Sequence, residues 1–250
     1  MDNENLAQIF TPTVKRSLAD DVAERVRNAI LCGQLAPEEP LREAVLSELL
    51  GVSRGPVRKA LSSLEREGLV VVGPTGRTCV ARLSYQDLDE VFSLRRTLER
   101  LAIEYACMRA TPEDISKVQA VVDAMASAIE RGISEKEAAE LDLRFHDALY
   151  SASRHQRLLG YWTTLRPQVY VFMLSRNVAS ANYQDAAVRG HQEILDAITA
   201  RDKQRALDVI EEHMLVAYEL VSQSYGQPCA DPDQDCRSDD PDGHPQLRNN

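Results

Sequence analysis

The first part of the chain alternates short apolar stripes with glycine and proline breaks. One amphipathic helix is predicted by residues that recur at helical spacing before Gly33, namely Leu18, Val22, Val26, Ala29 and Ile30. A shorter helix is predicted by the apolar residues before Gly51, namely Val45, Leu46, Leu49 and Leu50. A third helix follows Ser53, whose hydroxyl is expected to cap the free amides of its first turn. Its buried stripe is expected to consist of Val57, Leu61 and Leu64.

Two short strands are predicted after the third helix. Residues 69–72 are apolar and mostly β-branched, residues 73–76 have the composition of a tight turn, and residues 78–81 return as a second strand. The order helix, helix, glycine turn, helix and hairpin is that of a winged helix-turn-helix. We expect this domain to span residues 14–83, after an N-terminal tail over residues 1–13.

Helical periodicity dominates the chain beyond residue 83, where no convincing strand is found. It predicts six helices, over residues 86–110, 112–131, 134–153, 156–176, 182–200 and 202–224. Their short connections predict an all-helical bundle over residues 84–224. Residues 225–250 are rich in Pro and Asp and are expected to be disordered. The predicted fold is therefore mainly α, with an N-terminal winged helix-turn-helix followed by a helical bundle.

The charge is distributed unevenly along the chain. Its net charge of −10 argues at first against a nucleic-acid partner. Residues 14–83 nevertheless carry a net charge of +2, whereas residues 84–224 carry −6 and residues 225–250 carry −4. DNA binding is therefore expected of the first domain alone. Because one winged helix covers little DNA, two symmetric copies and hence a homodimer are expected.

Cysteine usage and the chain ends indicate a cytoplasmic protein. The five cysteines are scattered without a Cys-x-x-Cys pair, which is typical of reduced thiols. The first residues are acidic where a signal peptide would be basic. The uncharged stretch 167–175 is too short to cross a bilayer, so no membrane partner is expected.

Two arginines at the start of the third helix are the strongest candidates for DNA contact. Arg54 and Arg58 lie four residues apart and share its solvent face. In a helix-turn-helix this end enters the major groove, where an arginine can donate two hydrogen bonds to guanine. At the hairpin tip, Gly76 and Arg77 offer a backbone amide and a cation to phosphate or the minor groove. The alternative is a merely solvated basic surface.

Histidines on apolar helix faces suggest a metal site in the bundle. His146, His191 and His213 fall on the inward faces of three predicted helices, and Asp142 lies one turn before His146. A single such histidine is more often a packing residue. Three imidazoles with a carboxylate favour one divalent ion per chain, with zinc preferred and nickel or manganese as alternatives. His155, by contrast, is expected at the surface.

Arg95 interrupts the buried stripe of the helix predicted over residues 86–110. A buried guanidinium needs an anion, which is either Glu99 one turn later or the carboxylate of a ligand. A metal with one carboxylate and three neutral imidazoles keeps positive charge and open positions. Together with Arg95 it favours a small hydroxy, keto or dicarboxylic acid over a neutral sugar or a long acyl chain.

Residues 14–83 resemble the winged helix of GntR-type bacterial transcription regulators. The resemblance is carried by residues 41–43, 51–61 and 64–70. Residues 84–224 resemble the FCD effector domain, whose metal-binding members carry Asp-x-x-x-His and two later histidines, here Asp142, His146, His191 and His213. The resemblance implies a dimeric, ligand-responsive regulator, a repressor rather than an activator, that binds a palindromic operator.

Two departures from the family pattern concern candidate sites. Ala44 stands where the family commonly has an arginine that contacts DNA, and Arg42 is expected to substitute in part, beside a contact from Ser53. Gly190 stands where the family often has glutamate, which is expected to alter the support of His191.

Other functions receive less support from the sequence. It contains no Gly-x-Ser-x-Gly, His-Glu-x-x-His or glycine-rich phosphate loop. A metal-dependent hydrolase or lyase with an attached DNA-binding module would need a general base besides Asp142, and none is evident. Two further alternatives are a regulator whose metal is purely structural and a regulator with a metal-free pocket for an acyl ligand. We therefore expect a regulator and not an enzyme.

Overall fold

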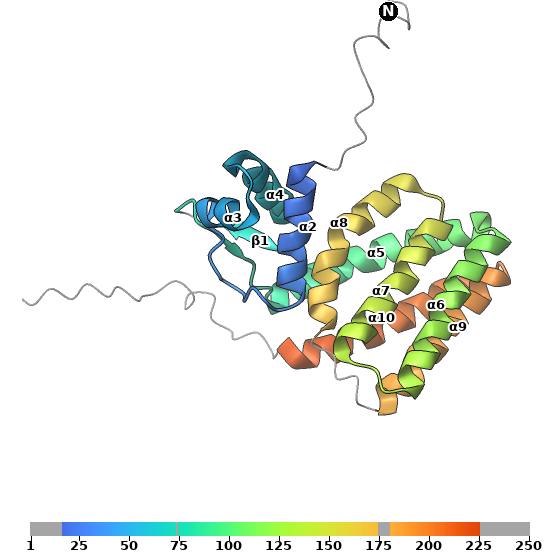
Figure 1. Cartoon of the computed structure of the whole chain (residues 1–250). Coiled ribbons are helices and arrows are strands. Elements are labelled where there is room, and N and C mark those ends of the chain that lie inside the picture. Colours follow the sequence, from blue (N-terminus) through green and yellow to red (C-terminus); the bar gives the residue numbers. More distant parts are fainter. Residues whose placement is uncertain (1–16, 74, 175–180, 226–250) are drawn as a thin grey trace, which may run out of the picture.

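The N-terminal part of the chain folds as a winged helix-turn-helix. The computed structural model describes residues 17–73, 75–174 and 181–225 (Figure 1). The tail expected over residues 1–13, and all but the first residue of the tail expected over 225–250, lie outside these ranges. The elements of the first domain are, in chain order, α2 (Leu18–Leu31), α3 (Glu43–Leu50), α4 (Arg54–Arg66), β1 (Val70–Val72) and β2 (Thr78–Val80).

Helix α2 begins and ends where local sequence signals place it. Ser17 and Asp20 form a reciprocal capping box, and Gly33 leaves the helix with a φ of 71°. The helix buries Val22 and Val26 against the rest of the domain. Leu18, expected on the same face, is instead exposed, because it lies in the first turn of the helix, beyond its packing partners.

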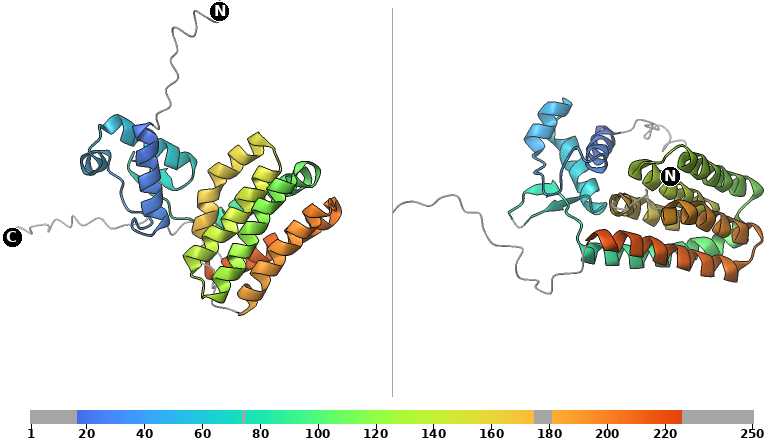
Figure 2. Two further views of the ribbon diagram at one scale, coloured as in Figure 1. Left: turned by 45° about the vertical axis from the view of Figure 1, so that its right-hand side comes forward. Right: turned by 90° about the horizontal axis from the view of Figure 1, so that it is seen from below.

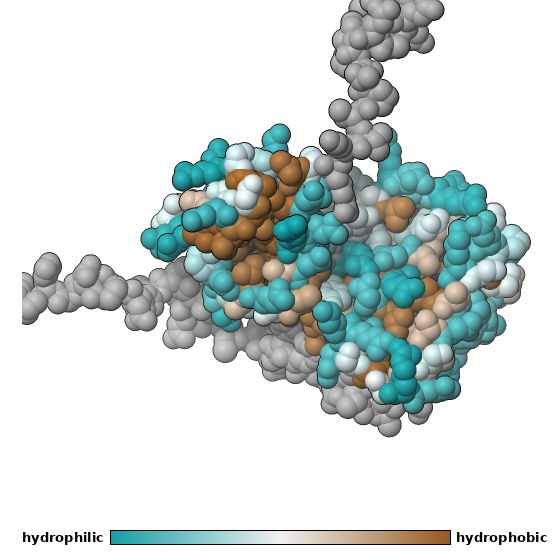
Figure 3. Space-filling model, in the orientation of Figure 1, coloured by the Kyte–Doolittle hydropathy of each residue, from teal (hydrophilic) through white to brown (hydrophobic). Residues whose placement is uncertain are grey.

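The apolar stripe predicted for α3 is only half used in packing. Leu46 and Leu50 pack against the core of the domain, but Val45 and Leu49 are 47% and 76% exposed. Eight residues make barely two turns, so a single side of α3 can reach α4. An apolar surface consequently lies over this region (Figure 3).

The hairpin forms in the predicted position. Strands β1 and β2 are antiparallel, with Val70 opposite Val80 and Val72 opposite Thr78. The segment before α3 runs along the free edge of β2, where the Leu41 amide donates a hydrogen bond of 2.8 Å to the Thr78 carbonyl. This third strip of backbone holds the wing against α4.

All six helices predicted for the second part of the chain are present. They are α5 (Tyr85–Arg109), α6 (Pro112–Glu130), α7 (Glu135–Ala152), α8 (Gln156–Met173), α9 (Ala181–Thr199) and α10 (Lys203–Tyr225). Helix α8 ends at Met173, whereas the prediction extended to 176. Helix α10 runs along α5, while α6 packs against both α7 and α9 (Figure 2). Within the described ranges, no helix has the length and apolarity needed to cross a membrane.

The bundle has an unusually polar interior between two apolar clusters. One cluster centres on Phe145 and Ile194, and the other on Trp162 and Leu143. Between them lie buried polar side chains from three helices, namely Arg95, Glu99, Asp142, His146 and His191. Burying polar and charged side chains costs free energy unless they bind one another or a ligand. This cluster is therefore the candidate for a binding site in the bundle.

Helix α8 is one of the points of contact between the bundle and the winged helix, and Lys136 of α7, whose Nζ lies 3.1 Å from the Sγ of Cys32, is another. Val171 packs against the apolar core of the winged helix. Gly68, with a φ of 68°, approaches α8 so closely that a Cβ atom there would lie 2.5 Å from the side-chain nitrogen of Gln168. The positive φ favours glycine at this position, and any side chain there would also require the amide group of Gln168 to move.

Candidate functional site

The N-terminus of α4 presents the predicted DNA-contacting residues to solvent. Ser53 occupies the N-cap position in an extended conformation, and both it and Arg54 are exposed. The expected capping bond from the Ser53 hydroxyl is absent in the described structure, so that prediction was wrong. Its hydroxyl and the first amides of the helix are turned to solvent instead, an arrangement suited to a phosphate oxygen.

Arg58 is exposed but already has a partner in the free protein. Its Nε and Nη2 each donate a hydrogen bond of 2.9 Å to the Glu43 carboxylate at the start of α3. This pairing raises the pKa of Arg58 and lowers the pKa of Glu43. The fork of Arg58 must therefore leave Glu43, or share it, before it can reach a base edge.

The remaining DNA-site candidates lie at two turns of the winged helix. Gly76 has a φ of 76°, and the Gly73 amide donates to the Arg77 carbonyl at 2.8 Å, which closes the turn at the wing tip. Arg77 is exposed there. Arg42 is exposed at the N-cap of α3, and Ala44, two residues later, is exposed as well. All six candidates are thus accessible on the first domain.

The four predicted metal ligands come together inside the bundle. Asp142 and His146 project from α7, His191 from α9 and His213 from α10, and one potential ligand atom from each lies within 4.8 Å of the others. The His146 Nε2 is 3.4 Å and the His191 Nε2 is 3.7 Å from the Asp142 carboxylate. Asp142, His146 and His191 are buried, and His213 is half-buried.

The orientation of the imidazoles fits a bound cation. The Nδ1 of His146 contacts the Glu99 carboxylate, and the Nδ1 of His191 is 2.5 Å from the Ala187 carbonyl. The Nε2 atoms of both rings consequently face the cluster. The Nε2 atoms of His146 and His213 are buried with no hydrogen-bond partner among the described residues. A metal ion would satisfy both lone pairs, so the donor set suits zinc or a similar divalent ion.

Arg95 makes one of the two contacts considered for it, the pair with Glu99, and it also approaches Asp142. The other contact, with the carboxylate of a ligand, stays a prediction. The Nε of Arg95 donates a hydrogen bond of 3.0 Å to Glu99, and its Nη2 lies 3.9 Å from the Asp142 carboxylate. Burial alone would raise the pKa of Glu99, but the charges of His146 and Arg95 lower it. Burial disfavours a charged His146, yet Glu99 raises the pKa of that imidazole. Burial and the two neighbouring imidazoles lower the pKa of His213.

Glu99 and Tyr150 are site residues that the sequence reasoning missed. Glu99 entered only as a partner of Arg95, although it also orients His146. Its position on the buried stripe was the available signal. The Tyr150 ring stacks on Trp162 at 4.7 Å, and its buried hydroxyl has no hydrogen-bond partner in the described ranges. Burial strongly raises the pKa of Tyr150, so the phenol stays neutral.

One expectation about neighbouring residues is corrected, and another is placed in the structure. A Cβ atom at Gly190 would lie 3.4 Å from the Nδ1 of His213, so this glycine, which precedes His191 in the chain, also lies beside a second predicted metal ligand. Its expected effect on the support of His191 stays a prediction. His155, expected at the surface, is half-buried, since it caps α8 by accepting a hydrogen bond of 3.2 Å from the Leu158 amide.

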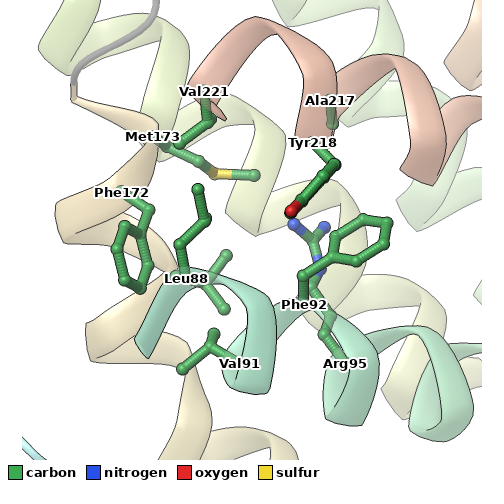
Figure 4. Close-up of a pocket in the computed structure, with 10 residues that line it drawn as sticks. Leu88, Val91, Phe92, Arg95, Phe172, Met173, Ala217, Tyr218 and Val221 are labelled. Atoms are coloured by element: carbon green, nitrogen blue, oxygen red, sulfur yellow. The ribbon is translucent and has the colours of Figure 1, made fainter. Parts of the chain in front are cut away.

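A pocket between α5, α8 and α10 ends at Arg95 (Figure 4). Its other lining residues are mainly apolar, namely Leu88, Val91, Phe92, Val169, Phe172, Met173, Ala217, Tyr218 and Val221. About 30 Å³ of the pocket is open to the centre of a water molecule. That space holds about two waters, so a larger guest requires side chains to move.

Comparison with known proteins gives two family matches on different parts of the chain. Residues 18–80 match "Bacterial regulatory proteins, gntR family", and residues 90–215 match the FCD domain. The HTH-type transcriptional repressor GlaR of Escherichia coli is 30% identical over 80% of this chain and 93% of its own length. A probable D-xylose utilization operon transcriptional repressor of Paenarthrobacter nicotinovorans is 28% identical over 86% of this chain and 95% of its own.

Solved structures share the fold. E. coli McbR/YncC superimposes with a TM-score of 0.71 at 24% identity, covering 85% of this chain and all of that one. A GntR regulator from Rhodococcus sp. RHA1 gives a TM-score of 0.68 at 22% identity over 84% of this chain and all of the other.

Proposed function

This chain belongs to the gntR family of bacterial regulatory proteins and carries an FCD domain, and from that membership we propose how it recognises DNA, metal and effector. Its relatives are named as transcriptional regulators. Like them, it is a ligand-responsive, DNA-binding transcriptional regulator and not an enzyme. Two of those relatives are named as repressors, and we propose the same sign of regulation here, in the bacterial cytoplasm.

DNA recognition is assigned to the exposed residues of the winged helix. Arg54 and Arg58 at the start of α4 read base edges in the major groove. Ser53, with the amides beside it, holds a backbone phosphate, and Arg42 adds a second anchor. Gly76 and Arg77 bring the wing to a phosphate or into the minor groove. The net charge of +2 on residues 14–83 supports this assignment, because the rest of the chain is acidic.

A single observation carries the metal proposal: four potential ligand side chains from three helices converge within 4.8 Å. Among them, the buried Nε2 atoms of His146 and His213 make no hydrogen bond with any described residue. We assign Asp142, His146, His191 and His213 to one divalent ion per chain, zinc before nickel or manganese. When bound, the ion supplies positive charge and open positions for oxygen atoms. Glu99 fixes the tautomer of His146 and keeps its Nε2 turned inward.

The effector is assigned to the space beside this cluster. Arg95 is buried, and its Nη2 has no hydrogen-bond acceptor in the described part of the chain. A carboxylate is the ligand that a guanidinium recognises best, through paired hydrogen bonds. We therefore assign a small carboxylic acid as the effector, held by Arg95 and the metal.

Helix α5 supports the homodimer that a palindromic operator needs. Leu94, Leu101 and Met108 are exposed at seven-residue intervals on this helix. Seven residues are two helical turns, so the three side chains form one apolar stripe. Exposed apolar stripes of this kind mark contacts between protein chains. We propose that the same stripe of a second copy covers it.

One experiment addresses the whole proposal. The purified full chain is used to select operator fragments from random DNA, and a panel of metabolite acids is then tested for release of the selected fragment. We expect release by a small acid from metal-loaded protein and much weaker release from metal-stripped protein. Equal release from both forms would favour the alternative in which the metal is purely structural. Failure to select any DNA would contradict the function itself.

A further inference from the structure

The pocket that ends at Arg95 has walls of a distinct chemical character. Leu88, Val91 and Phe92 of α5 face Phe172 and Met173 of α8, and Val221 of α10 closes the third side (Figure 4). Apart from Arg95, the polar atom nearest to the pocket belongs to Tyr218. Its hydroxyl is already paired with the Tyr85 hydroxyl at 3.1 Å and the Asp89 carboxylate at 3.3 Å. The pocket is therefore an apolar compartment with one cation at its inner end.

Arg95 stands between this compartment and the metal-ligand cluster. It lines the pocket, yet its Nη2 is 3.9 Å from the Asp142 carboxylate. The side chain is 5% exposed, and its Nη2 makes no hydrogen bond with any described residue. A buried donor without an acceptor is costly, so the guanidinium is poised for an anion that reaches it from within the bundle.

We propose that the effector is a carboxylic acid with a short apolar substituent on the carbon next to the carboxylate. This proposal rests on the assignment of the effector to Arg95 and the metal, and it narrows the class of acid. The carboxylate binds at Arg95, and the substituent enters the compartment between α5, α8 and α10. A hydroxy or keto oxygen on the same carbon remains on the side of the metal ligands.

Arg95 and the proposed metal, taken alone, would accept a dicarboxylic acid. The apolar walls of the pocket disfavour one. A second carboxylate in the compartment would lose its hydration and meet no donor other than Arg95. An apolar group gains there, by roughly fourfold in affinity for each buried methylene.

The size of the compartment limits the substituent. Only about 30 Å³ is now open to the centre of a water molecule. Met173 reaches across the pocket and is the side chain best able to yield, because an unbranched thioether changes rotamer at little cost (Figure 4). A branched group of three or four carbons is therefore expected to fit, and a long acyl chain is not.

The test is calorimetry on the full, metal-loaded chain with three acids that share one head group. Glycolate has no substituent, 2-hydroxy-4-methylpentanoate has a branched apolar one, and malate has a second carboxylate. We expect the branched acid to bind at least about tenfold more tightly than either of the others. Its heat capacity change should be the most negative of the three, as burial of apolar surface requires. Tighter binding of malate would overturn the proposal.

Variants separate this proposal from the one on which it rests. Met173→Gln should reduce the preference for the branched acid, whereas Tyr161→Gln, at a residue of the same helix that is 69% exposed, should preserve it. Met173→Leu should keep the preference and so exclude a folding defect. Suppose that the three acids bind the parent protein equally and that Arg95→Ala abolishes binding of all of them. The effector site at Arg95 would then be supported, and the proposed apolar substituent would be contradicted. If Arg95→Ala changes nothing, the effector site itself is wrong.

Discussion

At the scale of single residues, the bundle interior uses both nitrogens of its histidines. His146 is held through Nδ1 by Glu99, and His191 is held through Nδ1 by the Ala187 carbonyl. Each ring is thereby fixed with its Nε2 toward Asp142. Under the proposed metal assignment, both rings are already oriented before a cation binds, which keeps the cost of ordering the ligands low.

Removal of one ligand is the most direct test of the metal centre. His191→Ala should lose most of the bound metal, because it deletes one of four donors and opens a buried space. Metal analysis after mild dialysis should give about one equivalent for the parent and far less for the variant. His155→Ala, which removes a helix cap away from the cluster, is the matched control. Full retention in His191→Ala would mean that the histidines serve packing alone.

Replacement of the residue behind a ligand should weaken the metal without abolishing it. Glu99→Gln keeps the size of the side chain but removes the charge that His146 and Arg95 share. We expect metal affinity to fall by about 10- to 100-fold, as is typical for a partner of a ligating histidine. Competition with a chromophoric chelator measures the effect. Glu90→Gln, exposed on the same helix, should leave the affinity at the parental value.

Arginine substitutions in α4 test the DNA-reading residues. Arg54→Ala and Arg58→Ala should each weaken binding to the selected operator by about 5- to 150-fold, with less effect on random DNA. The effect of Arg58→Ala includes the release of Glu43, which is its partner in the free protein. Arg157→Ala, exposed on α8, is the control of equal charge. Affinities must be compared at one salt concentration, and equal values for parent and variants would contradict the assignment.

At the scale of elements, helical spacing and turn residues predicted nearly all of the fold. Glycines with positive φ end α2 and α3 where the sequence indicated. Periodicity could not tell which apolar residues face the protein and which face a partner. Leu49 belongs to the predicted stripe of α3 and is exposed. The position of Gly190 beside His213 depends on the relative rotation of α9 and α10, and no local signal reports that rotation.

The exposed stripe of α5 leads to a prediction about assembly. Leu101→Glu places a charge in the middle of the stripe formed with Leu94 and Met108, where a second copy is expected to pack. Light scattering after gel filtration should give a dimer mass for the parent and a monomer mass for the variant. Tyr161→Glu, at an aromatic residue on α8 that is 69% exposed, should leave the dimer intact. A dimeric Leu101→Glu variant would move the interface elsewhere.

At the scale of the whole molecule, the decisive contact is one that sequence patterns do not encode. The elements of each domain can be predicted from the periodicity of its apolar residues. The contact between the domains involves the approach of Gly68 to Gln168 on α8. These residues are a hundred positions apart, and although Gly68 lies in a stretch that resembles the GntR family, nothing in that stretch indicates its approach to Gln168. The same long-range packing brings Arg95 of α5 to Asp142 of α7. Contacts between residues far apart in the sequence therefore could not be predicted from local patterns and are seen only in the structure.

Helix α8 carries two contacts on adjacent residues. Val171 and Leu174 pack toward the winged helix, where Leu174 lines a cavity with Leu31 and Leu69. Phe172 and Met173 line the pocket that ends at Arg95. A ligand that shifts the last turn of α8, and not only the rotamer of Met173, would therefore also move Val171, because these residues follow one another at the end of the helix.

This geometry predicts a substitution that uncouples the two domains. Val171→Ala trims the contact of α8 with the winged-helix core but leaves the acid-binding pocket unaltered. We expect the effector to bind the variant with parental affinity while its effect on operator affinity shrinks. By thermodynamic linkage, operator DNA should then also affect effector affinity less, so both halves of the cycle can be measured independently. Val216→Ala, partly exposed on α10, is the matched control. A parental response in Val171→Ala would show that the signal reaches the DNA by a route other than α8, such as a change in how two copies pair along α5.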